Sequence, residues 1–135
     1  MDDFKRENEA ENGLVILKEL TGEIGREDLK QVIEDFETML DKVRGNTLLA
    51  DYLDDVKLMG LLVRDYYNGD YKKIPYRTIA IATFALLYII NPGDIIPEEL
   101  PFLGKIDGPM VLGLALLAIH RDLKNYREWK IAEDD

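Results

Sequence analysis

Four acidic side chains near the middle of the chain have the residue types best suited to chemistry. They are Asp94, Glu98, Glu99 and Asp107, and they lie in a stretch, residues 88–108, that also holds three of the five prolines. If the turn brings them together, their carboxylate oxygens are suitable ligands for a hard cation such as Mg²⁺ or Ca²⁺. The calcium-binding EF-hand spacing is missing, and both aspartates also suit turns and helix caps. We therefore assign no metal, and we keep Asp94, Glu98 and Asp107 as candidate binding residues.

The rest of the chain offers little for catalysis. It contains neither serine nor cysteine, which excludes the Ser-His-Asp triad, cysteine nucleophiles, disulfides and thiolate metal sites. His120 is the only histidine, and it closes an apolar run, as a residue at a helix end does. Gly-rich phosphate loops of the GxxxxGK and GxGxxG kinds are also missing from the sequence. We predict no catalytic residue and no cofactor.

A second group of residues mixes cations with aromatic side chains. It consists of Lys72, Lys73, Arg77, Arg121, Lys124, Arg127 and Lys130, together with Tyr71, Tyr76, Tyr126 and Trp129. A hairpin of the two apolar segments would bring all of them to one end. Cations among Tyr and Trp suit an anionic membrane surface, with Lys72, Lys73, Arg127 and Trp129 as the contacts. The same side chains also suit the solvated, aromatic-capped end of a bundle, so both interpretations stay open.

The elements that position these residues are predicted to be helices. Residues 26–44 carry an apolar stripe at i, i+3, i+4 and i+7, which predicts one amphipathic helix that ends at Gly45. Residues 46–68 repeat this pattern before Asn68-Gly69, and residues 14–20 predict a short first helix. Asp107-Gly108-Pro109 is typical of a helix start, opening a segment from Met110 to Lys124.

Two segments of the second half are strongly apolar. Residues 78–90 contain no charged side chain over 13 residues, and residues 109–119 contain none over 11. We expect both to be buried nearly all round in a helical bundle. Each is shorter than the roughly 20 residues that a membrane-crossing helix needs.

Length and charge limit the classes of protein to which the chain can belong. Its 135 residues suit one domain, and 47% hydrophobic residues are enough for a core. The formal charge of −10 disfavours nucleic acid as a partner, because phosphate binding needs clustered cations. Residues 1–70 carry a net charge of −9 and residues 71–135 only −1, so the two halves present different surfaces. No basic region followed by an apolar run opens the chain, which favours a cytoplasmic location.

A family resemblance is carried by the turn and its flanks. The residues are Leu86-Leu87-Tyr88-Ile89-Ile90-Asn91-Pro92-Gly93-Asp94-Ile95-Ile96-Pro97, followed by Pro101-Phe102-Leu103-Gly104-Lys105-Ile106-Asp107. They resemble the YkvA-like family of small bacterial and archaeal proteins, a domain of unknown function marked by Pro-x-Asp-x-x-Pro and a later Gly-x-x-Asp between two apolar helices. The resemblance covers about residues 56–124. It implies a helical fold and membrane association, and it implies no known reaction.

The chain departs from the family pattern at two acidic positions. Glu98 stands where the family has Asp after the second turn proline, and Asp107-Gly108 stands where it has a paired Asp-Asp. One carboxylate of any shared acidic site is therefore missing here.

Together these observations predict an all-α protein, a compact bundle of four to five helices around a central hydrophobic hairpin joined by a Pro-rich loop. Residues 1–135 form one domain, with an amphipathic helical extension at 1–55 and the YkvA-like hairpin region at 56–130. The expected function is non-enzymatic: a module for binding a protein partner or for self-association, at the membrane periphery. A membrane-inserted helical hairpin and a divalent-metal-dependent hydrolase that uses the acidic turn remain alternatives. The expected partners are a protein or a second copy and an anionic membrane surface, with no nucleic acid.

Overall fold

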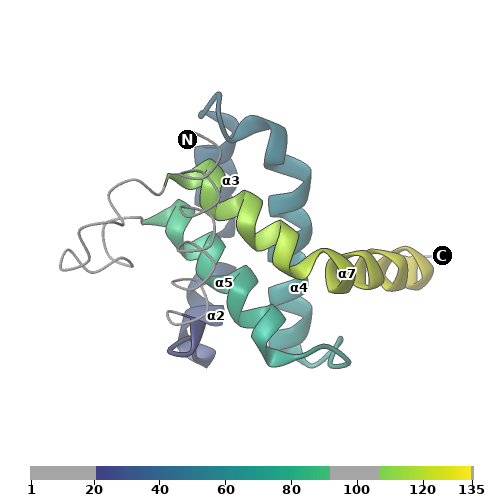
Figure 1. The fold of residues 1–135 in the computed structure, drawn as a ribbon. Coiled ribbons are helices and arrows are strands. Elements are labelled where there is room, and N and C mark those ends of the chain that lie inside the picture. The colour runs from purple at the N-terminus through teal and green to yellow at the C-terminus, as the bar shows by residue number, and fades with distance from the viewer. Residues whose placement is uncertain (1–20, 92–106, 135) are drawn as a thin grey trace, which may run out of the picture.

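The computed structural model describes residues 21–91 and 107–134, and in these two ranges the chain is helical with no strand. This confirms the predicted all-α class. Five α-helices and one short 3₁₀ helix fall within the described residues (Figure 1): α2 (Arg26–Glu34), α3 (Phe36–Arg44), η1 (Ala50–Tyr52), α4 (Leu53–Asn68), α5 (Tyr76–Ile90) and α7 (Gly108–Asp134). The short helix expected at residues 14–20 and most of the Pro-rich loop lie outside the described residues.

Helix α5 forms the centre of the bundle. It packs against α2, α3, α4 and α7, and its residues from Thr78 to Leu86 are all buried. The hydroxyl of Thr83 is fully buried and needs a hydrogen-bond partner. It donates to the carbonyl of Ile79, one turn earlier, at 2.7 Å. The uncharged run therefore predicts burial correctly for this helix.

Helix α7 differs from the expectation in two ways. It continues to Asp134 instead of ending at Lys124, and its C-terminal half projects beyond the other helices (Figure 1). Its apolar first half is not buried all round, since Leu117 is 72% exposed. The physical reason is that, among the described helices, α7 packs mainly on α5 and α4, and Leu117 lies on the side turned away from them.

The two amphipathic segments are also divided more finely than the apolar stripe predicts. The segment 26–44 bends at Asp35 (φ −98°, ψ 12°), which separates α2 from α3. The second segment enters α4 only at Leu53. The side chain of Asn46 accepts the N–H of Leu48 at 2.9 Å in a turn, and η1 follows this turn before α4 begins. Its predicted end is confirmed, with Gly69 in the left-handed conformation (φ 83°) as the C-cap.

Candidate functional site

The two ends of the helical hairpin meet at one end of the bundle, as the sequence predicts. Tyr71, in the connection between α4 and α5, packs its ring against Tyr126 and Trp129 of α7, with ring centroids 5.1 and 4.8 Å apart. Close by, the hydroxyl of Thr78 donates to a carboxylate oxygen of Asp122 at 2.6 Å. The α4–α5 connection and the distal part of α7 therefore form one continuous structure.

A buried carboxylate fixes this arrangement. The side chain of Asp65, on α4, is only 5% exposed, and it accepts hydrogen bonds from the hydroxyl of Tyr126 at 2.6 Å and from Nζ of Lys130 at 3.2 Å. Arg64 donates to its other oxygen at 3.2 Å. The backbone carbonyl of Asp65 also accepts the N–H of Asp70 at 2.8 Å, so the same residue holds the start of the α4–α5 connection.

The charge state of this group follows from its partners. Burial by itself raises the pKa of the Asp65 carboxyl, but the three hydrogen bonds outweigh burial, and the pKa lies below its ordinary value. Burial also raises the pKa of Tyr126, and the hydrogen bond to the Asp65 carboxylate raises it further. Both groups therefore stay in the forms that bond to each other, a carboxylate and a neutral phenol, which is the behaviour of a structural anchor.

Sequence reasoning missed Asp65, although a signal was present. The residue follows Leu62 by three positions and therefore lies on the buried side of α4, where a charged residue needs a partner. Lys130 and Tyr126 were instead placed among the cations and aromatic side chains at the end of the hairpin, for which a membrane contact and a solvated bundle end both stayed open. The structure gives Lys130 a carboxylate partner and buries Tyr126 completely.

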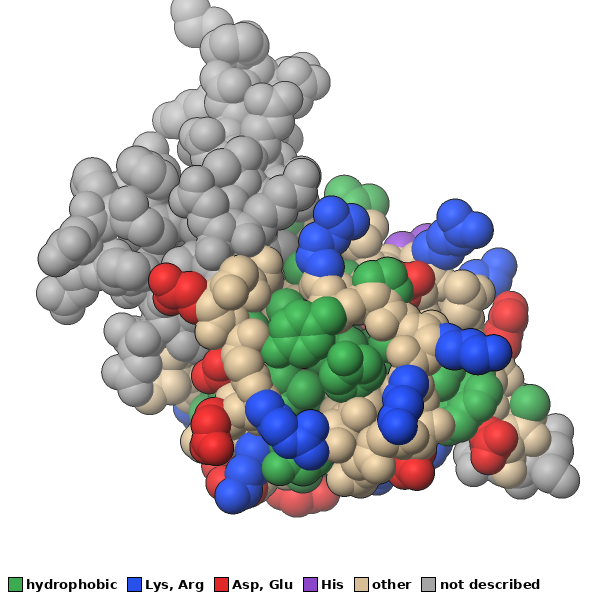
Figure 2. All heavy atoms as spheres, turned by 90° about the horizontal axis from the view of Figure 1, so that it is seen from below, with side chains coloured by type: hydrophobic (Ala, Val, Ile, Leu, Met, Phe, Trp, Pro, Cys, Tyr) green, Lys and Arg blue, Asp and Glu red, His purple; other side chains and the backbone are tan. Residues whose placement is uncertain are grey.

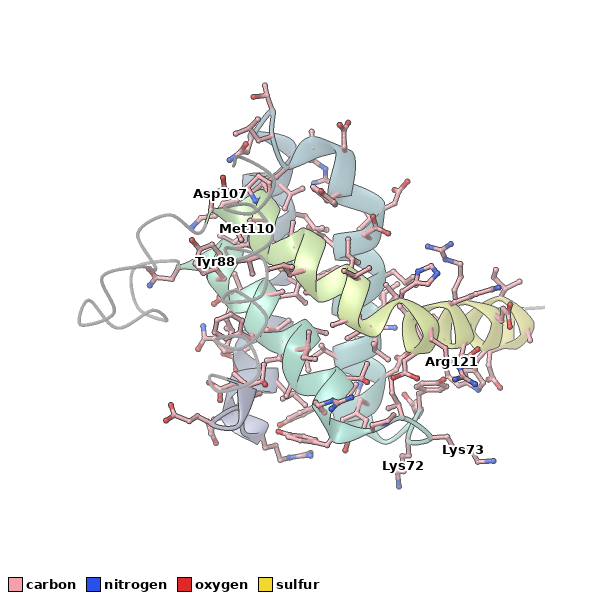
Figure 3. The ribbon with its side chains drawn as sticks, in the orientation of Figure 1. Lys72, Lys73, Tyr88, Asp107, Met110 and Arg121 are labelled. Carbon is pink, nitrogen blue, oxygen red and sulfur yellow. The ribbon has the colours of Figure 1, made fainter. Side chains whose placement is uncertain are left out.

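The cations that remain available lie beside an aromatic cluster. Lys72, Lys73 and Arg77 are exposed, and none of them forms an ion pair within residues 21–91 and 107–134. Lys72 and Lys73 point away from the bundle at its lower end (Figure 3). Viewed from that end, hydrophobic side chains gather in the middle of the face, with Lys and Arg side chains around them and Asp and Glu side chains toward its edges (Figure 2).

We call this surface the basic–aromatic face and define it by residues that line one groove or contact its lining, together with Lys73, which projects from the same end of the bundle. They are Arg26, Tyr66, Tyr67, Lys72, Lys73 and Tyr76. The guanidinium of Arg26 lies 4.0 Å above the ring of Tyr67, and the rings of Tyr66 and Tyr76 are 6.1 Å apart. The face thus joins the first turn of α2 to the end of α4 and the start of α5.

The structure does not bring all four predicted membrane contacts to this face. Lys72 and Lys73 belong to it, but Trp129 is partly buried against Tyr71 and Tyr126. Arg127 lines a groove with Asp55 and His120 instead. It is two residues before Trp129, about 200° away around the helix, so the two side chains lie on opposite sides of α7. Their contact with lipid stays a prediction that this placement does not favour.

The acidic turn is described only at its last residue. Asp94, Glu98 and Glu99 lie outside the described residues. Asp107 caps α7 as predicted, since its carboxylate accepts the N–H of Met110 at 2.8 Å and its carbonyl accepts that of Val111 at 3.0 Å (Figure 3). Within the described part of the chain, no three carboxylate or imidazole groups come together in a way that could hold a metal ion.

The described helices define a small all-α protein built on a hydrophobic helical hairpin, formed by α5 and α7. Residues 78–108, which include nearly all of α5, match a family described as a protein of unknown function (DUF1232). The chain is also similar to the uncharacterized membrane protein YkvA of Bacillus subtilis (strain 168), with 41% identity over 70 residues. Both matches support a YkvA-like domain of unknown function in this part of the chain.

The matches cover only part of each protein, which limits what can be inferred from YkvA about this chain. The match to YkvA covers 52% of this chain and 66% of that relative, just under two thirds of its length. No solved structure matches the chain. Searched over the described residues, the helices include none that combines the length and the apolar character needed to cross a membrane.

Proposed function

We propose that this protein is a non-enzymatic module that attaches to the cytoplasmic surface of an anionic membrane through the basic–aromatic face. The observation that carries the proposal is the pair of exposed lysines, Lys72 and Lys73, in the connection that leads into α5, whose first residue, Tyr76, is 43% exposed. Cations next to interfacial tyrosines match the headgroup region of such a membrane. The name of the Bacillus relative, an uncharacterized membrane protein, supports the same proposal.

Electrostatics makes this attachment weak and oriented. Each cation near an anionic surface contributes about 1 kcal/mol, so Lys72, Lys73 and Arg26 together supply about 3 kcal/mol. Asp70 is exposed in the same connection, and the net charge of −10 opposes approach from any other side. The protein would therefore bind reversibly and in one orientation, with its acidic helices turned away from the lipid and available to a protein partner.

Co-flotation with vesicles tests this proposal. We expect the protein to float with vesicles of anionic phosphatidylglycerol in phosphatidylcholine, and to float less as salt is raised, because the Debye length falls from about 10 Å at 0.1 M to about 3 Å at 1 M. The double variant Lys72→Gln/Lys73→Gln should bind about 30-fold less tightly at low salt, since it loses about 2 kcal/mol.

A second double variant, with two cations removed outside the basic–aromatic face, tests whether binding depends on that face or only on the net charge. The variant Arg44→Gln/Lys57→Gln changes the total charge equally, but Arg44 ends α3 and Lys57 lies in the first half of α4, outside the basic–aromatic face. It should keep most of the binding. Equal losses in the two double variants, or no flotation of the unsubstituted protein, would refute the proposal.

The outer side of α7 favours a second role, self-association. Met110, Leu114, Leu117 and Ala118 lie on one side of this helix, at spacings of three and four residues. None of them is buried, and Leu117 is 72% exposed. An apolar stripe of this kind on a helix is well suited to a two-fold symmetric contact with the same stripe of a second copy.

Sedimentation equilibrium tests the self-association. We expect the protein to dimerise and Leu117→Glu to make it monomeric, because the new carboxylate would be buried without a partner in the contact. Ile131→Glu is the control, since Ile131 is 58% exposed on the same helix but about 20 Å further along it. A dimer that survives Leu117→Glu, or a protein that is monomeric at all concentrations, would contradict this role.

A further inference from the structure

The basic–aromatic face contains a groove between the start of α2 and the end of α4. It has a volume of about 370 Å³ and is lined by Arg26, Tyr66, Tyr67, Asn68, Gly69 and Lys72. Two of these side chains are cations, two carry a phenol hydroxyl, and one is a carboxamide that offers N–H groups. No carboxylate lines the groove, although the chain as a whole is strongly acidic. The lining is therefore selective for an anion.

The arginine of this groove is held in place before any ligand arrives. Its guanidinium lies 4.0 Å over the ring of Tyr67, and one of its nitrogens donates to the carbonyl of Tyr67 at 3.3 Å. No other hydrogen bond or ion pair of Arg26 occurs within the described residues, so its remaining N–H groups are uncommitted. A guanidinium fixed by stacking loses little side-chain entropy when it binds a phosphate with two hydrogen bonds.

The lysine of the groove depends on a glycine. Gly69 has φ of +83°, and a Cβ built on it would lie only 3.2 Å from Cε of Lys72. The aliphatic part of Lys72 therefore lies against the backbone of Gly69, which brings its ammonium group to the same groove as Arg26. The nearby carboxylate of Asp28 is engaged elsewhere, because it accepts the N–H of Gly25 at 2.9 Å.

We propose that this groove binds a phosphate monoester, with Arg26 as the bidentate ligand, Lys72 as the second cation, and the tyrosine rings as the wall beside the ester group. The same chemistry is offered by a membrane lipid with a terminal phosphate and by a soluble phosphate monoester. The lipid source rests on the proposed membrane attachment, whereas the groove itself does not. A site of this kind adds preference for one headgroup to an otherwise general attraction to negative charge.

The first measurement uses soluble probes. Inorganic phosphate and glycerol 3-phosphate are titrated into the ¹⁵N-labelled protein, and we expect the amide signals of Asn68, Gly69 and Lys72 to shift, with much smaller shifts for chloride at equal ionic strength. Arg26→Gln should weaken this binding about tenfold or more, the effect of losing charge-assisted hydrogen bonds, and Arg26→Lys should restore only part of it. Lys30→Gln, one turn further along α2, is the control of equal charge.

The second measurement uses vesicles of matched surface potential that contain either phosphatidic acid, which has a terminal phosphate, or phosphatidylglycerol, which does not. Preference for phosphatidic acid that is lost in Arg26→Gln assigns the groove to a lipid headgroup. Binding of the soluble probes without vesicle binding keeps the groove and refutes membrane attachment. Equal binding to both vesicle types, with no shift by either soluble probe, refutes the groove while membrane attachment stands.

Discussion

Replacing Asp65 with alanine is expected to lower the free energy of unfolding by about 3 kcal/mol, the range for removing one partner of a buried charged pair. The substitution leaves the hydroxyl of Tyr126 buried without an acceptor and Lys130 without its carboxylate. Urea unfolding followed by circular dichroism measures the change directly. In a thermal scan the same loss should appear as a fall in Tm of about 10 °C for a chain of this size.

The stability lost in Asp65→Ala should decrease as the pH falls into the acidic range. The pKa of Asp65 is lowered in the folded protein from an ordinary value of 3.8, so folding favours the ionised form. Its contribution is fully present above the unfolded pKa and is lost as the pH falls through the lower, folded pKa. The difference in unfolding free energy between the parent protein and Asp65→Ala should therefore be constant from neutral pH to about pH 5 and shrink below 3.8.

Two further variants locate the source of the effect. Asp54→Ala removes an exposed carboxylate from the same helix and should change stability by less than about 0.5 kcal/mol. Tyr126→Phe removes one hydrogen bond but leaves Asp65 its two cations, so it should cost about 1 kcal/mol. If Asp54→Ala proved as harmful as Asp65→Ala, the loss would come from helix charge and not from the buried network.

The sequence predicted helices well because burial repeats regularly along them. The uncharged run of α5 is buried, the Asn68-Gly69 turn ends α4, and Asp107 caps α7, each for a reason that is local in the chain. The bend at Asp35 and the late start of α4 interrupt the stripes without changing which residues face the core. A periodic pattern shows which side of a helix is apolar, but it does not show where the helix axis bends or where the helix begins.

The candidate site was harder to predict, because its composition depends on the side of α7 from which each side chain projects. Sequence placed Arg127, Trp129 and Lys130 together with Lys72 and Lys73 because a hairpin brings them to one end. The end was correct, but these three side chains leave α7 on different sides, toward a groove, an aromatic cluster and Asp65. Arg26 was missed altogether, because nothing local in the chain shows that the first turn of α2 lies beside Tyr67, 41 residues away.

Replacing Gly60 with alanine is expected to lower the free energy of unfolding by about 2 kcal/mol, because overpacking costs up to about 3 kcal/mol and the better helix propensity of alanine returns about 1 kcal/mol. Gly60 is buried in the middle of α4, and a Cβ built there would lie 2.1 Å from Cε2 of Phe36 on α3. Real side chains do not approach so closely, so the ring or the helix must move. The close crossing of α3 and α4 thus depends on this glycine.

A second glycine provides the matched control. Gly113 lies within α7, and the atom nearest to a Cβ built there is the hydroxyl of Tyr52 at 3.8 Å, an ordinary contact. Gly113→Ala should therefore raise stability by about 1 kcal/mol through helix propensity alone. Shortening Phe36 to leucine should recover part of the Gly60→Ala loss, since the two changes act on one space. Equal stabilisation by both alanine variants would show that the Phe36 ring moves aside freely and that α3 does not depend on Gly60.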